Sequence, residues 1–315
     1  MKRRPKRARE MSKRQLYLAC PRGFCAGVKR ALTIVDKALE AYGTPLYVFH
    51  EIVHNDYIVK NLRDKGVIFV DDVNEVPVNS NLIYSAHGVS RVVESDSGQR
   101  NLHTVDASCP LVKKVHTKAN RLSEEGYSVL LIGHRSHPEV AGTIGQVDAP
   151  VQIIETIDCV ANVVAPEGTK LAYLTQTTLS ADDTKDIVDA LYKRFPDING
   201  ANDICYATQN RQNAVKVLAE KCDTIFVIGS VKSSNSNRLR EVARKLGCAG
   251  FLIDSVDDLK PEMYENAKNI GISAGASAPE CLVDGLVEFF ESEGWAEPIL
   301  VETVKENVKF SLPKI

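Results

Sequence analysis

The chain contains CAGVKRALTIVDKALEAYG (25–43), CPLVKKVHTKANRLSEEG (109–126) and CYATQNRQNAVKVLAEK (205–221), each of which begins with a cysteine. Apolar residues recur in each stretch at helical spacing, so each is predicted to form a single helix. Gly43 is a typical helix stop. The heading cysteines lie 84 and 96 residues apart. This nearly even spacing indicates three units built on one plan.

The segments that follow each helix repeat in the same order. An apolar strand with a polar end comes first (45–55, 127–139 and 223–238), then a short second strand (67–72, 151–156 and 250–255), then a third strand with a small-residue turn (82–90, 171–180 and 270–280). His54, His137 and Asn235 lie 29, 28 and 30 residues after their heading cysteines. Ligands bind beyond the carboxyl ends of strands in open α/β sheets, so these polar residues are expected at one shared site.

The repeat predicts the domain organisation. We expect a first α/β unit at 15–109, a second at 110–205 and a third at 206–294. A C-terminal tail at 295–315 is expected to pack back on the core. Ser90, Ser180 and Asn235 are expected to cap the helices that follow them.

Composition and charge limit the class of protein. The chain has 315 residues, of which 44% are hydrophobic, enough for two or three compact cores. No apolar run approaches a membrane span, which predicts a soluble protein. Residues 1–14 carry eight Lys or Arg and one Glu without an apolar signal-peptide core, and are expected to be a disordered basic extension. The remainder has 31 basic and 40 acidic residues, so we expect no nucleic-acid or membrane partner and a cytoplasmic location.

The eight cysteines are the three heading cysteines, Cys20, which is expected to be buried in the strand before Cys25, and four others. Eight cysteines without a secretory signal indicate a reducing compartment, with free or metal-bound thiols. No C-x-x-C pair is present, which disfavours a redox dithiol or a zinc ribbon. Cys159, Cys222, Cys248 and Cys281 share no position in the repeat, so they are expected to be small buried side chains.

One short motif points to a different chemistry. His50-Glu51-Ile52-Val53-His54 matches the H-E-x-x-H signature of zinc peptidases, which needs both histidines on one helix. Tyr47, Val48 and Phe49 lead into His50 as a strand, and Asn55 has the character of a helix cap. We therefore expect the motif to lie in a strand end and loop, which excludes the peptidase interpretation.

Two metal groups fit three cysteines that converge at the centre of three units. One is zinc with a histidine as fourth ligand, in a scaffold that binds an anion without catalysis. The other is a [4Fe–4S] cluster with one iron free of protein ligands. The surrounding hydroxyls, amides and histidines, with the single carboxylate of Glu139 among them, favour the cluster.

Nine motifs then carry a resemblance to a known family. They are PRGFCAG (21–27), HEIVHN (50–55), SAHGVS (85–90), DASCP (106–110), GHRSHPE (133–139), TQTTLS (175–180), DICYAT (203–208), SSNSNRL (233–239) and GASAPE (275–280). In this order they resemble the 4-hydroxy-3-methylbut-2-enyl diphosphate reductases of the non-mevalonate isoprenoid pathway. The resemblance runs from about Leu16 to near Phe310.

The resemblance implies a fold and a cofactor. It implies three similar α/β units in a pseudo-threefold, clover-like arrangement around a central iron–sulfur cluster. It also implies a [4Fe–4S] cluster held by Cys25, Cys109 and Cys205, with one open iron that binds the substrate hydroxyl. Single electrons are implied to come from a donor such as a ferredoxin or flavodoxin.

The resemblance further implies the substrate and its contacts. The substrate is an allylic alcohol that carries a diphosphate, and the products are isopentenyl and dimethylallyl diphosphate. Glu139 is implied to supply protons and Thr177 to order Glu139 and the substrate hydroxyl. The implied diphosphate contacts are His54, His87, His137, Thr177, Ser233, Ser234, Asn235 and Ser277. His50 and His134 match motif positions and are expected to support these residues from behind.

Overall fold

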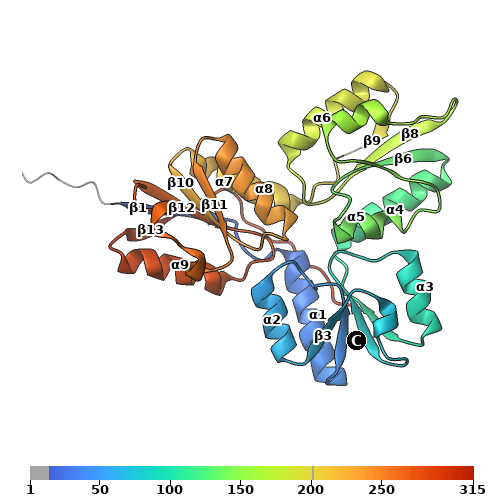
Figure 1. Cartoon of the computed structure of the whole chain (residues 1–315), viewed down its shortest axis with the longest axis horizontal. Coiled ribbons are helices and arrows are strands. Elements are labelled where there is room, and N and C mark those ends of the chain that lie inside the picture. The colour runs from blue at the N-terminus through green and yellow to red at the C-terminus, as the bar shows by residue number, and fades with distance from the viewer. Residues whose placement is uncertain (1–13, 201) are drawn as a thin grey trace, which may run out of the picture.

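The computed structural model describes residues 14–200 and 202–315, and the predicted disordered extension at 1–14 lies almost entirely outside this part. The described chain forms three parallel sheets, each with helices against it. Figure 1 shows the three sheets as the lobes of a flat clover. The predicted fold class, three similar α/β units, is thereby confirmed.

The first sheet has the strand order β3-β2-β4-β5. Its strands are β2 (Leu46–Phe49), β3 (Val67–Val70), β4 (Asn81–Tyr84) and β5 (His103–Asp106), and its helices are α1 (Ala26–Tyr42), α2 (Asp56–Asp64), the short η1 (Val73–Glu75) and α3 (Arg91–Gln99). The apolar face of α1, including Ala31, Ile34 and Val35, packs in one core cluster with Val48 and Ile83 of the sheet. Because these side chains are buried on one face of α1, the apolar residues recur in the sequence with the period of a helix.

The second sheet repeats this order as β7-β6-β8-β9. Its elements are β6 (Tyr127–Ile132), β7 (Gln152–Ile154), β8 (Lys170–Thr175), β9 (Asn199–Gly200), α4 (Pro110–Glu124), α5 (Pro138–Ile144), the short η2 (Ile157–Asn162) and α6 (Ala181–Arg194). Ser90 and Ser180 cap α3 and α6 by accepting from the backbone N–H groups of Val93 and Asp183, as predicted.

The third sheet has the order β11-β10-β12-β1-β13. Its elements are β1 (Gln15–Cys20), β10 (Thr224–Ile228), β11 (Ala249–Ile253), β12 (Asn269–Ala274), β13 (Ala296–Glu302), α7 (Tyr206–Ala219), α8 (Ser234–Lys245), η3 (Val256–Asp258), η4 (Pro261–Met263) and α9 (Glu280–Ser292). β1 pairs with β12 in parallel, with Gln15 opposite Asn269. The N-terminal strand therefore lies in the same sheet as elements more than 200 residues away.

The same pairing rule places strands in all three sheets, and it does not follow the predicted unit boundaries. The strand before each heading cysteine pairs with the third strand of the preceding unit: β5 with β4, β9 with β8, and β1 with β12. β1 thus belongs to the sheet of the third unit, although we had assigned all of 15–109 to the first. β13, which we had placed in the tail, is an edge strand of the same sheet. Each cysteine consequently sits where the chain passes from one sheet to the next helix.

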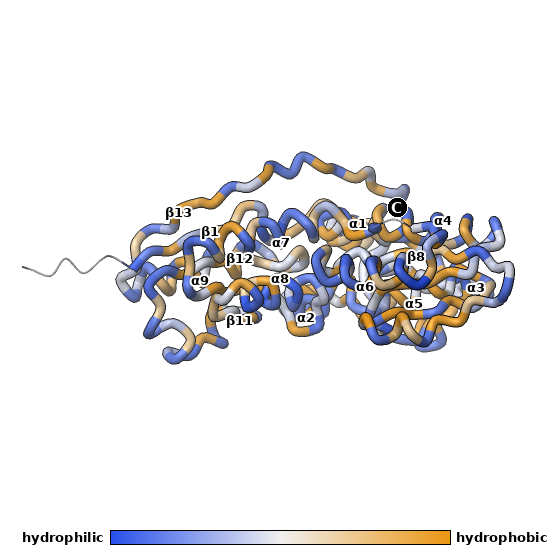
Figure 2. Tube along the Cα trace, turned by 90° about the horizontal axis from the view of Figure 1, so that it is seen from above, coloured by the Kyte–Doolittle hydropathy of each residue, from blue (hydrophilic) through white to orange (hydrophobic). Residues whose placement is uncertain are grey.

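The last residues run along the outside of the molecule. Figure 2 shows the segment after β13 crossing the face on which α1 and α7 lie. Arg30 donates to the backbone carbonyl of Ser311 at 2.8 Å, and Ile315 packs against the core of the first unit. No helix in residues 14–200 or 202–315 is long and apolar enough to cross a membrane.

The HEIVH stretch lies outside any helix. β2 ends at Phe49 and α2 begins at Asp56. His50 has a left-handed backbone conformation with φ of 58°, and Asn55 caps α2 by accepting from the backbone N–H of Ile58. The two histidines are thus not one turn apart on a helix, so the zinc-peptidase interpretation fails as expected.

Candidate active site

The three heading cysteines occupy the N-cap positions of helices. Cys25 caps α1, Cys109 precedes α4 and Cys205 caps α7. All three line one internal space of about 110 Å³, which we call the inner cavity. Helix N-termini carry partial positive charge, which favours anionic sulfur and anionic ligands. The structure thus brings together the cysteines that the repeat singled out.

Gly27 sets how closely α1 approaches the second cysteine. A Cβ atom at this position would lie 2.7 Å from Sγ of Cys109 and 3.8 Å from Sγ of Cys25. The first distance is far below van der Waals contact, so only glycine allows this approach. Sequence reasoning missed Gly27 as a site residue. The signal was a glycine in the first turn of an otherwise regular helix, where alanine has the higher helix propensity.

In the described part of the chain, no cationic side chain stabilises the charged form of the Cys109 or Cys205 thiol. Burial raises the pKa of the Cys109 thiol to about 12 and also raises that of Cys205, and nearby Cys25 adds to both effects. Thiolates at this position therefore need a positively charged partner. A metal group supplies such a charge, so the three residues fit the thiolate-ligated cofactor that the sequence implied.

Three histidines gather beside the cysteines. His54 follows β2, His87 follows β4 and His137 follows β6, so two units contribute. The ring centroids of His54 and His87 are 4.3 Å apart, and that of His137 lies 5.4 and 5.7 Å from them. All three line the inner cavity. His54 and His87 follow adjacent strands of the first sheet, and His137 joins them from the second sheet, so each lies beyond the carboxyl end of a strand as predicted.

Two of these rings are neutral hydrogen-bond donors. Burial lowers the pKa of His137 to about 3 and holds that of His87 well below its ordinary value. Nδ1 of His137 accepts from the backbone N–H of Glu139 at 3.2 Å. The proton of the neutral ring therefore lies on Nε2, which remains free to donate. Such rings suit an anion that is bound without further proton exchange.

Glu139 is a buried carboxyl group with a raised pKa. It lies in the first turn of α5 and is only 3% exposed. Burial raises its pKa to about 7, against two hydrogen bonds from Thr177 that favour the charged form. The Thr177 backbone N–H donates to Oε1 at 2.6 Å and its hydroxyl donates to Oε2 at 2.8 Å. A carboxyl group with this pKa carries a proton for part of the time at neutral pH, which is the property of a general acid.

The third unit contributes hydroxyls and an amide. Ser233, Ser234, Asn235 and Ser277 all line the inner cavity. The expected cap role of Asn235 is wrong: Ser233 caps α8 by accepting from the Ser236 N–H, and Asn235 Oδ1 accepts from the Ala276 N–H at 2.9 Å. Nδ2 of Asn235 is buried without a partner in the described structure. Leaving such a donor unpaired costs about 1–3 kcal/mol, so this amide is suited to receive a ligand atom.

A larger space adjoins the inner cavity. This outer cavity has a volume of about 640 Å³ and is lined by residues of all three units. His54, His137 and Ser234 line both spaces, so they mark the passage between them. His50 and His134 line only the outer cavity; His50 pairs with Asp71 at 2.8 Å. The backbone carbonyl of His134 accepts from the His137 N–H at 2.9 Å, and the supporting role of His50 and His134 stays a prediction.

Gln176 is a second residue that sequence reasoning missed. Its Oε1 accepts from the backbone N–H of His134 at 3.0 Å, and its Nε2 donates to Thr178 at 2.8 Å and approaches Ser234 at 3.5 Å. It thus links the turn after β8 to the start of α8 in the third unit. It stands in the TQTTLS motif beside Thr177, which was the available signal.

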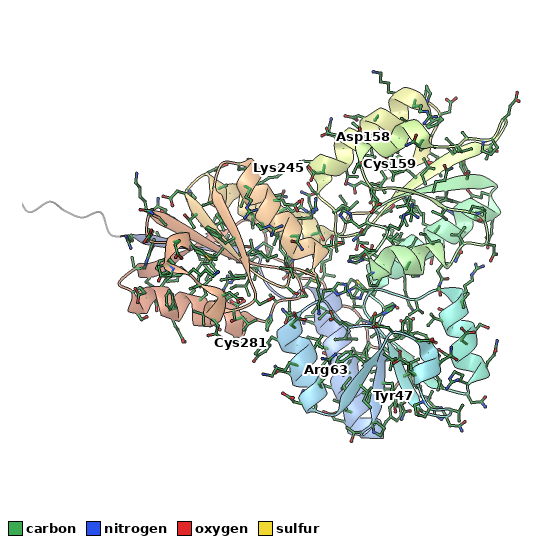
Figure 3. All side chains as sticks on the ribbon, in the orientation of Figure 1. Tyr47, Arg63, Asp158, Cys159, Lys245 and Cys281 are labelled. Atoms are coloured by element: carbon green, nitrogen blue, oxygen red, sulfur yellow. The ribbon has the colours of Figure 1, made fainter. Side chains whose placement is uncertain are left out.

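Four of the other cysteines, Cys159, Cys222, Cys248 and Cys281, do not line the inner cavity. Cys222 and Cys248 are buried, as expected, and Cys248 Sγ donates to the Cys222 carbonyl at 3.1 Å. Cys281, however, is exposed on α9, and Cys159 is only partly buried in the second unit (Figure 3). The expectation that these two are buried is therefore wrong: Cys159, in η2, packs only against the margin of the core of the second unit, and Cys281, in α9, approaches the Tyr57 hydroxyl of α2.

Comparisons with known proteins agree with this geometry. The family model described as LytB protein matches residues 16–291. The 4-hydroxy-3-methylbut-2-enyl diphosphate reductase of Aromatoleum aromaticum is 50% identical over 306 residues, which cover 96% of this chain and 98% of that protein. The enzyme of the same name from Ectopseudomonas mendocina is 51% identical over 305 residues, with 95% and 97% covered.

Two solved structures have the same fold. The E-1-hydroxy-2-methyl-but-2-enyl-4-diphosphate reductase of Plasmodium falciparum superposes with a TM-score of 0.93 at 38% identity, covering 96% of each chain. A structure of (E)-4-hydroxy-3-methyl-but-2-enyl diphosphate reductase has a TM-score of 0.65 at 31% identity, covering 88% of this chain and 99% of that one. The chain therefore belongs to the LytB protein family and, like the reductases that it matches, is an oxidoreductase.

Proposed function

We propose that the protein converts (E)-4-hydroxy-3-methylbut-2-enyl diphosphate to isopentenyl and dimethylallyl diphosphate. The reaction breaks the allylic C–O bond, consumes two electrons and two protons, and releases water. The observation that carries this proposal is the composition of the inner cavity. Three cysteines, one protonatable carboxyl group and several neutral hydrogen-bond donors line the same space.

Cys25, Cys109 and Cys205 would hold a [4Fe–4S] cluster through their thiolates. When bound, this group supplies single electrons and an open iron for the substrate hydroxyl. Zinc is the alternative. Within residues 14–200 and 202–315, no three His, Cys, Asp or Glu side chains converge closely enough to hold one metal ion. A cluster takes each thiolate on a separate iron and so suits sulfurs that lie further apart than a single zinc ion requires.

The diphosphate would occupy the side of the cavity that is rich in donors. His87 and His137 donate as neutral rings, and the unpaired Nδ2 of Asn235 offers another hydrogen bond. The hydroxyls of Ser233, Ser234 and Ser277 add short, adaptable donors. No P-loop is present in the sequence, so recognition would depend on these side chains together with His54 and the N-terminus of α8.

Glu139 would deliver protons to the departing hydroxyl, and Thr177 would hold it in place. Its pKa of about 7 lets it give up a proton and regain one near neutral pH. The two hydrogen bonds from Thr177 fix both carboxyl oxygens. The substrate hydroxyl would lie within reach of this pair.

The electrons would come from a small one-electron carrier protein such as a ferredoxin or flavodoxin, in the cytoplasm. The test is an anaerobic assay of cluster-reconstituted protein with the allylic diphosphate and an artificial one-electron donor. We expect both products, together with iron and sulfide in the active protein. A colourless protein that contains zinc and gives no product would favour the binding scaffold instead.

A further inference from the structure

A lysine of the third unit connects to two carboxylates of the first unit at the mouth of the site. Lys232, in the loop between β10 and α8, places Nζ 2.7 Å from Oε1 of Glu51 and 2.8 Å from Oδ1 of Asp56. The Lys232 side chain is 50% exposed, whereas that of Glu51 is 22% exposed. Lys232 and Glu51 both line the outer cavity. This contact therefore joins two units where a ligand would pass inward.

Glu51 in turn holds the ring of His54. Oε2 of Glu51 lies 3.1 Å from Nδ1 of His54. The pKa of Glu51 is lowered to about 2, first by the hydrogen bond from His54 and further by Lys232, against the effect of burial. The carboxylate is thus charged at physiological pH and accepts from both neighbours. Its partner Nδ1 must carry a proton, which leaves Nε2 of His54 as the ring atom available to a ligand.

His54 is also held through its backbone from the third unit. The hydroxyl of Ser277 donates to the His54 carbonyl at 3.0 Å. In residues 14–200 and 202–315, neither His87 nor His137 forms a salt bridge with a carboxylate. His54 is therefore the member of the histidine group whose ring orientation is set by a charged chain of contacts that crosses a unit boundary.

We propose that Glu51 and Lys232 are positioning residues that aim His54 at the diphosphate, with Lys232 fixing Glu51 across the boundary between the third and first units. This inference rests on the proposed function, because His54 is one of the expected diphosphate contacts. The pair touches no reacting atom. Its loss should therefore weaken binding of the diphosphate more than it slows the chemical step.

Lys232 has another conceivable role, since its ammonium group faces the outer cavity and could contact the diphosphate directly. The two roles differ in a double-mutant cycle. If Lys232 acts only through Glu51, the change Lys232→Met has no further effect once Glu51→Gln is present. If Lys232 binds the ligand itself, the two effects multiply.

The experiment uses cluster-loaded protein under anaerobic conditions and compares E51Q, K232M, K232R and the double variant E51Q/K232M. The control is K65M, because Lys65 forms a similar exposed pair with Asp36 at 2.9 Å, away from both cavities. KM and kcat for the allylic diphosphate are measured with an artificial reductant. The dissociation constant of inorganic pyrophosphate is measured by calorimetry, as a readout that is independent of turnover.

For E51Q we expect KM and the pyrophosphate dissociation constant to rise about tenfold or more, because a hydrogen bond to a charged group is lost. For the half-exposed Lys232, K232M should raise both by roughly fivefold at most, and K232R should restore the parent values. The double variant should resemble E51Q, with kcat changed less than about twofold in each case.

Two results would overturn the inference while the proposed function stands. One is an active parent protein whose E51Q variant has the same KM and pyrophosphate dissociation constant as K65M. The other is a double variant in which the effects of E51Q and K232M on these constants multiply. A parent protein that neither turns over the diphosphate nor binds pyrophosphate would instead refute the proposed function. The unfolding midpoint of each variant is compared with that of K65M. This comparison shows whether weaker binding results only from a less stable fold.

Discussion

Replacement of Glu139 by glutamine tests the proposed acid directly. Glu139 is the one Asp or Glu that lines the inner cavity in the described part of the chain. Glutamine keeps the shape of the side chain. Its Oε1 can accept from the Thr177 N–H, and its Nε2 can donate to the Thr177 hydroxyl, which rotates to accept. The variant should therefore fold and bind the diphosphate normally.

The rate of the chemical step should fall strongly in this variant. An amide cannot give a proton to a departing hydroxyl, and loss of a positioned acid costs about 10²- to 10⁴-fold in rate. We expect this loss in kcat, with KM close to that of the parent. In the parent, kcat should fall as the pH rises through about 7, because Glu139 must carry its proton to act. That limb of the pH profile should be absent from the residual activity of the variant.

The same variant changes how stability depends on pH. Burial raises the pKa of Glu139 from its ordinary value of 4.5 to about 7. Below 4.5 both the folded and the unfolded states hold the proton, so nothing is lost. Between 4.5 and 7 only the unfolded state releases it, so the free energy of unfolding of the parent falls with rising pH. At about 1.4 kcal/mol per pH unit the loss amounts to roughly 3 kcal/mol, which E139Q should avoid.

The assays are anaerobic steady-state kinetics from pH 5.5 to 9 and denaturant unfolding at about pH 4.5 and 8. E155Q is the matched control, because Glu155 is an exposed carboxylate that also accepts a backbone hydrogen bond, from Arg135. Turnover of E139Q near that of the parent would refute the acid role and leave Glu139 with its contacts to Thr177 only. A parent whose stability is flat over this range would refute the raised pKa.

Three further sets of substitutions, at the cysteines, at Gly27 and at Asn235, test the rest of the site. Cys25→Ser, Cys109→Ser and Cys205→Ser should each abolish activity and sharply reduce bound iron, whereas Cys222→Ser and Cys248→Ser should leave iron content and rate near parent values; an essential Cys222 would contradict the repeat. Gly27→Ala should reduce iron incorporation, measured by metal analysis, because its Cβ would lie 2.7 Å from the Cys109 sulfur, and normal incorporation would refute this steric argument. Asn235→Ala should raise KM by about one to two decades through loss of a donor to the diphosphate, and an unchanged KM would remove Asn235 from the pocket.

Local features of the site were predictable because they depend on neighbours in the sequence. The helices after Cys25, Cys109 and Cys205 follow from their apolar period, and the caps by Ser90 and Ser180 follow from side chains that bond within one turn. The position of the polar residues after strands then places them at one edge of each sheet. These steps need no knowledge of distant contacts.

Non-local features could not be predicted in the same way. Nothing near Gln15 in the sequence indicates a partner at Asn269, so β1 was assigned to the wrong unit. In SSNSN (233–237) every residue is a Ser or an Asn, so each could cap a helix and the local rule does not choose between them. The choice falls to Ser233, because Asn235 is held by the Ala276 N–H of another turn. Contacts between distant parts of the chain thus determine both the sheet to which β1 belongs and the residue that caps α8.

The cyclic strand order explains why Gly27 and Lys232 escaped prediction from local sequence. Because each cysteine stands between the sheet of one unit and the helix of the next, all three boundaries meet at the inner cavity. A residue at such a boundary contacts residues of the neighbouring unit. Lys232 donates to Glu51, which is 181 positions away in the sequence, and position 27 requires glycine because the Cys109 sulfur lies so close. Side chains of this kind look ordinary in the sequence, and only the assembled boundary shows which residues they contact.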